Sequence, residues 1–344
     1  MKLLSTSKQL QKMELQSERT KQISYLIFNF FSTIAVTFIN KICFSKVSFG
    51  FPAALCNIHF LITFLGVEIM RKLGVFRSLY QNQSPSSQPS LRDPNFLAVV
   101  VVVGLVTPLN NTSLKLNSVG FYQLFKLLVT PGVVLLEYIL DGKVLSGLRT
   151  LSLSAVCVFV LISSNADLEF SAYGTLCASI WVPLAAAYKV QWGRVKNKYS
   201  CSTLQLMHAV LPYALLVQIV ISPIVDPPGL MNFEWTPEAM FWIGLSGVCA
   251  FLVNFSGFLV MGNVGALAHV LLGQLKTAVI MIGSSFVFNS HYSSTQIASA
   301  IGAIGSIVAY TQITVYEKEH FRPGQDSKYE GDLKEEILPM RSKF

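Results

Sequence analysis

Ten stretches of mostly apolar residues, separated by short polar links, cover most of this 344-residue chain. A helix that spans a membrane needs ~20 such residues, so the pattern predicts a bundle of transmembrane α-helices. Only 13% of the residues are charged, whereas a soluble domain usually carries about 25%. We therefore predict an all-α membrane protein with no room for a second, soluble domain.

The predicted spans are Lys21–Cys43, Gly50–Arg71, Pro94–Leu114, Val119–Leu140, Leu148–Ser164, Ser171–Tyr188, Leu204–Pro223, Glu238–Met261, Gly265–Phe288 and Ser293–Tyr316. They form one membrane domain over residues 21–316, with halves of about 21–164 and 171–316. Residues 1–20 are predicted to be an N-terminal tail, and the charged residues 317–344 a disordered C-terminal tail.

The positive charges indicate the orientation of the chain in the lipid bilayer. Most of the 26 Lys and Arg residues fall in the two tails and in the even-numbered links. The opposite side has only Lys41, Lys46 and Lys115. Because cytosolic segments carry an excess of Lys and Arg, both termini are predicted to be cytosolic. A nucleic-acid partner is not expected, since the chain has no soluble basic face.

Two lysines fall inside predicted spans. An ionisable residue there costs ~2.5–3.5 kcal/mol on insertion scales, and it is usually retained where it faces a cavity, a partner or a ligand. Lys126 lies ~10 Å into the fourth span and Lys276 ~16 Å into the ninth, so both can approach the middle of the bilayer. Glu68 and Glu137, the acidic residues within spans, fall near the cytosolic ends. Two cations without acidic partners indicate an anion site that phosphate can occupy.

The alternative for each lysine is that it extends to the membrane surface or pairs with a glutamate. The scarcity of acidic residues in the spans also argues against a pump coupled to protons or sodium. We predict that the substrate site includes polar or small residues near the two lysines, together with one histidine of the seventh span. These residues are Tyr122, Gln123, Gly273, Gln274, Thr277 and His208.

The two halves repeat one feature. Asn117-Ser-Val-Gly begins the fourth span and Asn263-Val-Gly begins the ninth, and a lysine follows each about ten residues later. Matching features on helices of opposite direction are typical of a 5+5 inverted repeat, with substrate bound between the halves. On the last span, Ala298, Gly302 and Ser306 form a stripe of small residues, which favours close helix packing or a homodimer.

Four motifs carry a resemblance to a known family: Phe38-Ile-Asn-Lys41, Asn117-Ser-Val-Gly-Phe-Tyr-Gln-Leu-Phe-Lys126 with Pro131, Val253-Asn-Phe-Ser-Gly-Phe, and Gly273-Gln-Leu-Lys-Thr277. Over roughly residues 24–316 the chain resembles the nucleotide-sugar transporter and triose-phosphate translocator family of the drug/metabolite transporter superfamily. The nearest pattern is the subgroup with Lys-Thr on the ninth helix, whose plant members move UDP-galactose, UDP-rhamnose or UDP-xylose.

The resemblance implies ten helices and alternating access, with a cytosolic nucleotide sugar exchanged for a lumenal nucleoside monophosphate. It also implies a Golgi membrane, with the endoplasmic reticulum or another endomembrane as alternatives, and adds Lys41 to the candidate site. In the phosphate translocators a Lys-Arg pair on the ninth helix holds phosphate, and here Thr277 stands in place of the arginine. This favours a UDP-linked sugar, and exchange of phosphate or phosphorylated metabolites is the alternative.

An enzyme acting on lipid-linked phosphates would need acidic metal ligands, or a nucleophile with a base, near the membrane face. The sequence has no Asp-rich or His-rich cluster, and its six cysteines form no CxxC pair. We therefore expect a carrier rather than an enzyme, with no cofactor and no metal site.

Overall fold

The computed structural model describes residues 2–79, 88–166, 171–263 and 266–320. The described part is helical and contains no strand. Its elements are α1 (Lys2–Ser45), α2 (Pro52–Lys72), α4 (Pro94–Leu116), α5 (Val119–Phe125), η2 (Lys126–Leu128), α6 (Val129–Asp141), α7 (Gly147–Asn165), α8 (Ala172–Lys198), α9 (Thr203–Val225), η3 (Leu230–Asn232), α10 (Pro237–Asn263), α11 (Ala266–Phe288) and α12 (Ser294–His320).

Within the described residues, 8 helical segments are long and apolar enough to cross a membrane. Large apolar side chains lie on their outer surfaces, including Ile224 at 81% exposure and Val220 at 73%. Such a surface suits lipid, because side chains that face hydrocarbon need no polar partner. The prediction of an all-α membrane protein is confirmed. Neither α8 nor α11 is among the 8 segments, although the apolar part of α11 covers Leu272–Phe288.

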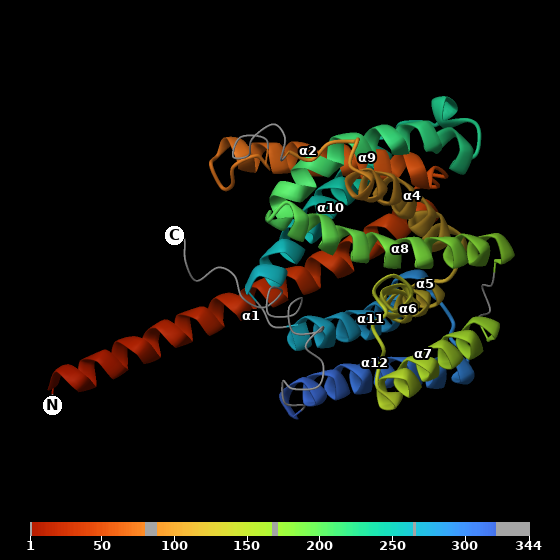
Figure 1. Cartoon of the computed structure of the whole chain (residues 1–344). Coiled ribbons are helices and arrows are strands. Elements are labelled where there is room, and N and C mark those ends of the chain that lie inside the picture. The colour runs from red at the N-terminus through yellow and green to blue at the C-terminus, as the bar shows by residue number, and fades with distance from the viewer. Residues whose placement is uncertain (1, 80–87, 167–170, 264–265, 321–344) are drawn as a thin grey trace.

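Three helices differ from the prediction, one in where it begins, one in where it ends and one in being interrupted. The helix of the first span begins at Lys2, so the predicted tail of residues 1–20 is largely helical and projects from the bundle (Figure 1). The sixth helix continues past Tyr188 to Lys198. The fourth span is divided, because a short 3₁₀ segment separates α5 from α6. The predicted C-terminal tail lies almost wholly outside the described residues.

Short polar side chains begin several of the helices. Ser118, Ser171 and Ser202 each accept a hydrogen bond from a backbone N–H of the first turn, in α5, α8 and α9 respectively. The start of α2 is capped by a residue distant in sequence. The carboxylate of Asp226, just after α9, accepts hydrogen bonds from the first N–H groups of α2 at 2.7 and 2.8 Å. Helix starts leave such donors unpaired, so these residues fix where the helices begin.

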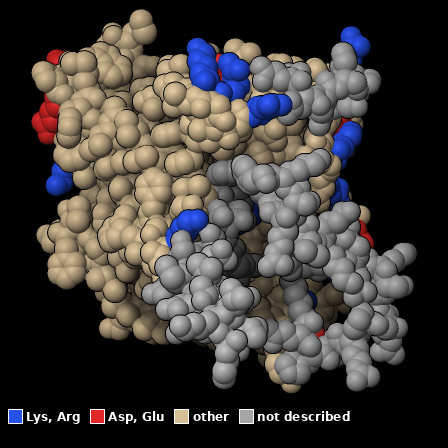
Figure 2. Space-filling model, turned by 90° about the vertical axis from the view of Figure 1, so that its left-hand side faces the viewer, with Lys and Arg blue, Asp and Glu red and all other residues tan. Residues whose placement is uncertain are grey.

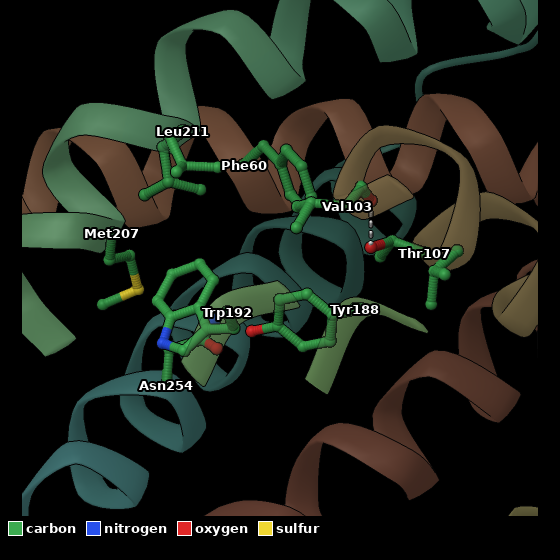
Figure 3. Close-up of a pocket in the computed structure, with 10 residues that line it drawn as sticks. Phe60, Val103, Thr107, Tyr188, Trp192, Met207, Leu211 and Asn254 are labelled. Carbon is green, nitrogen blue, oxygen red and sulfur yellow. Dashed lines mark hydrogen bonds between the residues drawn. The ribbon is translucent and has the colours of Figure 1, made fainter. Parts of the chain in front are cut away.

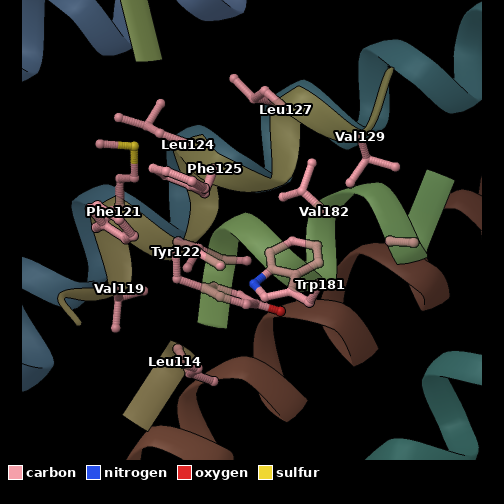
Figure 4. Packing of buried hydrophobic residues seen from close by; sticks show 14 of the residues in the cluster. Leu114, Val119, Phe121, Tyr122, Leu124, Phe125, Leu127, Val129, Trp181 and Val182 are labelled. Carbon is pink, nitrogen blue, oxygen red and sulfur yellow. The ribbon is translucent and has the colours of Figure 1, made fainter. Parts of the chain in front are cut away.

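The helices pack in two groups with a shared middle (Figure 1). Helices α2 and α9 lie on one side of the bundle, and α7 and α12 pack together on the other. Between them, α1 packs along α10, α4 along α8, and α11 against α1, α5 and α12. One buried apolar cluster surrounds α5, where Phe121 stacks on Phe125 at 4.5 Å (Figure 4). A second lies between α2, α4 and α9.

Basic side chains gather at the end of the bundle where α2 and α8 terminate (Figure 2). The last turns of these helices contain Arg71, Lys72, Lys196 and Lys198. This end also holds most of the ion pairs of the described residues, which are Arg71–Glu68, Arg194–Asp141, Lys143–Glu137, Lys198–Asp93 and Arg149–Glu317. The acidic residues predicted to lie near the cytosolic ends of spans are therefore occupied by local basic partners.

Candidate functional site

Lys126 lies where the fourth span changes its helical form. Pro131 has no backbone N–H, so it cannot bond the carbonyl of Leu127, and its ring crowds that carbonyl. The chain responds with the 3₁₀ segment Lys126–Leu128 between α5 and α6. The residues of α5 are all buried, whereas the Lys126 side chain is exposed. The proline therefore interrupts the α-helix at Lys126, and the side chain of this lysine lies at the edge of the apolar cluster.

Lys276 is buried in α11, at 8% exposure. Its ammonium group donates a hydrogen bond to the side-chain oxygen of Asn29 on α1. The amide nitrogen of Asn29 donates in turn to the hydroxyl of Ser256 on α10, at 2.9 Å. Asn29 is 4% exposed and Ser256 is fully buried. Three helices thus meet at one buried cation, and the group that contacts this cation is neutral.

Lys126 and Lys276 lie close enough for their charges to interact. Lys126 has no hydrogen-bond or ion-pair partner among the described residues. Lys276 has Asn29 and no carboxylate within the same part of the chain. Because like charges repel in a low-dielectric interior, two ammonium groups that no carboxylate compensates are costly unless an anion joins them. This is the main electrostatic feature of the site.

The sequence analysis placed one lysine of the sixth helix outside the predicted span. It ended the sixth span at Tyr188, which left Lys189 outside the membrane, but α8 continues through that position. The side chain of Lys189 is exposed. The sequence does carry a signal for this longer helix. It is the polar stretch that follows Tyr188, which includes Gln191 and Trp192.

The candidates on α5 lie in the protein interior. Tyr122 packs against Trp181 of α8, with ring centroids 6.1 Å apart (Figure 4). Gln123 is 2% exposed, and its amide nitrogen has no hydrogen-bond partner among the described residues. The indole nitrogen of Trp181 is likewise buried without a hydrogen-bond partner among the described residues. Buried polar atoms are rarely left unpaired, so these donors indicate a place for water or a ligand between α5 and α8.

The candidates on α11 surround Lys276. The hydroxyl of Thr277 donates to the carbonyl of Gly273 at 3.2 Å, so it is held within its own helix. The side-chain oxygen of Gln274 is buried without a partner among the described residues. Among the described residues, and apart from the backbone of the helix itself, no atom lies within 4 Å of the position that a Cβ would take at Gly273. The backbone is therefore open to a ligand on that side.

Two candidate residues, Lys41 and His208, lie apart from Lys126 and Lys276. The ammonium group of Lys41 donates to carbonyls at the end of α4, at 3.0 Å to Leu114 and 2.7 Å to Asn117. It is 12 residues, or about 18 Å, along α1 from Asn29. His208 bonds the carboxylate of Glu68 at 2.9 Å and stacks on Phe64. Both contacts satisfy structural needs, because carbonyls at helix ends lack internal donors and carboxylates in spans need partners.

A cavity of about 220 Å³ opens between α2, α4, α8, α9 and α10 (Figure 3). Its wall is largely apolar, with the rings of Phe60, Tyr188 and Trp192 and the thioether of Met207. Thr107 and Asn254 add polar groups. The amide nitrogen of Asn254 donates to a carbonyl of its own helix, and its side chain is exposed. An aromatic wall with few polar groups is typical of a small-molecule pocket.

The comparisons with known proteins identify the family. A profile described as the Triose-phosphate Transporter family matches residues 20–317. The chain belongs to this family. Two relatives from Arabidopsis thaliana are named Nucleotide-sugar uncharacterized transporter 1 and 2. They are 34% and 33% identical, over 84% of this chain and 72% and 71% of their own lengths.

Relatives with assigned substrates are more distant. UDP-xylose transporter 2 of the same plant is 27% identical, over 86% of this chain and 82% of its own. A solved crystal structure with 15% identity superposes with a TM-score of 0.56, covering 88% of this chain and 99% of that one. It shows a shared fold. The resemblance that the four motifs predicted is confirmed by these matches.

Proposed function

We propose that this protein is a nucleotide-sugar antiporter of an endomembrane, most simply the Golgi membrane. In this proposal a cytosolic UDP-linked sugar is exchanged for a lumenal nucleoside monophosphate. The observation that carries it is the pair Lys126 and Lys276, whose charges interact and face no carboxylate in the described part of the chain. Phosphate oxygens are the natural countercharge for such a pair. The named substrates of the UDP-sugar relatives agree with this chemistry.

The proposed architecture is a domain of residues 21–316 with ten spans in two inverted halves, and both termini in the cytosol. The packing supports it, because helix contacts occur in matching sets. Helix α4 packs along α8 as α10 packs along α1, and α6 contacts α8 as α11 contacts α1. A two-fold relation between the halves requires such pairs. The basic end of the bundle in Figure 2 is then the cytosolic end.

In the proposed site the two lysines hold phosphate. Gly273, Gln274 and Thr277 line it on α11, while Tyr122 and Gln123 line it on α5. Support comes from the unpaired buried amide groups of Gln123 and Gln274 and the open space beside Gly273. Lys41 and His208 are left out of this site, since each is engaged by a structural partner elsewhere.

Exchange follows from the same charges. Closing the empty site would leave two ammonium groups repelling each other in low dielectric, whereas a bound phosphate neutralises them. The halves then change orientation readily only when loaded. A substrate must therefore accompany each return step, which is the behaviour of an obligate antiporter.

Uptake by proteoliposomes tests the proposal. Vesicles preloaded with UMP should take up a labelled UDP-sugar much faster than vesicles without UMP. Lys276→Ala should abolish this uptake, and Lys72→Ala, a change on the exposed last turn of α2, should leave it unchanged. Equal uptake with and without UMP would contradict the exchange step, and wild-type uptake by Lys276→Ala would contradict the site.

The alternative function is exchange of phosphate or small phosphorylated metabolites, and the family profile supports it. Two lysines alone do not distinguish a sugar phosphate from a nucleotide. Competition in the same vesicles does, because inhibition by inorganic phosphate but not by UMP would favour this alternative.

A further inference from the structure

Another cavity, of about 400 Å³, lies between α6 and α7 and has no part in the site proposed above. Each helix contributes one stripe of residues three or four positions apart, which places each stripe on one face of its helix. The stripes are Pro131, Val134, Leu135 and Tyr138 on α6 and Thr150, Leu153, Ser154 and Cys157 on α7. Residues 143–145 of the connecting turn close one end. The two helices leave this groove open because α6 packs along α8, whereas α7 packs along α12 at the edge of the bundle (Figure 1).

The groove opens on the outer surface of the bundle, where Leu135, Tyr138 and Val144 are exposed. Pro131, at its far end, and Asp141, the last residue of α6, are separated by about 15 Å along the helix axis. This is half of the ~30 Å hydrocarbon thickness of a bilayer. The groove therefore has the depth of one lipid leaflet, as an acyl chain requires when its headgroup lies at the connecting turn.

The connecting turn has charges of both signs. The ammonium group of Lys143 lies 3.7 Å from the carboxylate of Glu137 and 3.9 Å from that of Asp141. Both distances are too long for a hydrogen bond. Neither Lys143 nor Glu137 forms a hydrogen bond in the described part of the chain, and both side chains are partly exposed. The turn can thus donate hydrogen bonds to a phosphate and accept them from an ammonium group.

We propose that the groove between α6 and α7 binds a phospholipid with an ethanolamine headgroup. One acyl chain lies between the two stripes, the phosphate accepts a hydrogen bond from Lys143, and the ammonium group of the lipid donates one to Glu137. A zwitterionic headgroup matches this turn, because Lys143 and Arg194 balance Glu137 and Asp141 there. Choline has the same charges but no N–H to donate. The site is separate from Lys126 and Lys276, so the proposal does not depend on the substrate.

The test compares two lipids that differ in the headgroup alone. Palmitoyl-oleoyl phosphatidylethanolamine, or the phosphatidylcholine with the same chains, is added to the purified full chain, and bound lipid is measured by native mass spectrometry. The ethanolamine lipid should bind about fivefold tighter or more, as expected for a hydrogen bond to a charged group. Glu137→Leu should remove this preference, whereas Lys143→Met should weaken the binding of both lipids. Lys46→Met, exposed at the opposite end of the bundle, is the control and should bind both as the wild type does.

A second substitution tests the groove itself. Ser154→Trp places an indole ring between the stripes and should prevent both lipids from binding, whereas Leu161→Trp, two turns further along α7 and also exposed, should not. If Ser154→Trp fails to fold, Glu137→Leu still decides, because it changes only the turn. Equal binding of the two lipids by the wild type, or undiminished binding by Ser154→Trp, would overturn the proposal. So would a dimer in lipid-free detergent that Ser154→Trp dissociates, because a second copy of the chain would then occupy the groove.

Discussion

Asn29→Leu tests whether the polar contact in the middle of the bundle stabilises the protein as the structure implies. The substitution keeps the size of the side chain and removes both hydrogen bonds of the amide group. Lys276 then loses its acceptor and Ser256 loses its donor. Both of these partners are buried, so water does not simply replace the lost amide.

The magnitude follows from the two bonds. A neutral hydrogen bond between transmembrane helices contributes on average about 0.6 kcal/mol. A hydrogen bond to a charged group contributes about 1.5–3 kcal/mol, and here the ammonium group is left buried. Asn29→Leu should therefore lower the free energy of unfolding by about 2–3.5 kcal/mol. Most of that loss depends on the charge of Lys276.

A double-mutant cycle isolates this dependence. In a Lys276→Met background, Asn29→Leu should cost only about 0.6 kcal/mol, so the coupling energy is about 1.5 kcal/mol or more. The assay is thermal and denaturant unfolding of the purified protein in detergent. Asn40→Leu is the control on the same helix, because Asn40 is equally buried but bonds the neutral groups of Asn111 and Ser246. Additive effects of the changes at 29 and 276, within about 0.5 kcal/mol, would refute the reasoning.

Three further predictions concern stability. Asp226→Ala removes the cap on α2 and should cost about 1–2 kcal/mol by thermal unfolding, whereas Glu238→Ala, exposed in the first turn of α10, should change little. Burial opposes ionisation of Asp93, but its partners at the end of α8 outweigh this effect and lower its pKa. Wild-type stability should therefore fall as pH drops below about 4, and Asp93→Asn should show a smaller fall in acid titrations. Gly302→Ala would place a Cβ 2.7 Å from a ring carbon of α7 and should cost about 1–3 kcal/mol, while Gly305→Ala, with open space, should be neutral or slightly stabilising in the same melts.

The apolar runs were sufficient to predict the helices, because each needs only ~20 residues of one character. They were less informative about helix ends. The sixth span loses its apolar character at Tyr188, although the helix continues to Lys198, and Lys189 was left outside the predicted span for this reason. The division of the fourth span had a visible cause in Pro131, whose effect on the preceding turn is local and predictable.

Charge alone led the sequence analysis to a candidate site at Lys126 and Lys276, and their role there stays a prediction. The sequence could not show contacts with partners that lie far away in the chain. Nothing near Lys41 in sequence shows that its ammonium group reaches the carbonyls at the end of α4. The stripe containing Gly302 similarly had two interpretations, and the structure places this glycine against Phe159 of α7, which accounts for it by packing within one chain.

For the charge of Lys276, it matters whether the group that accepts its hydrogen bond is a neutral amide or a carboxylate. A carboxylate at position 29 would satisfy the ammonium group equally well, but it would also cancel its charge and occupy the place of an incoming anion. The amide oxygen of Asn29 satisfies the hydrogen bond and leaves the charge uncancelled. Since Lys126 has no carboxylate partner among the described residues either, the proposed site would keep its attraction for anions while its buried donor stays paired with Asn29. A buried lysine next to an asparagine is thus the arrangement expected where a ligand, rather than the protein, supplies the negative charge.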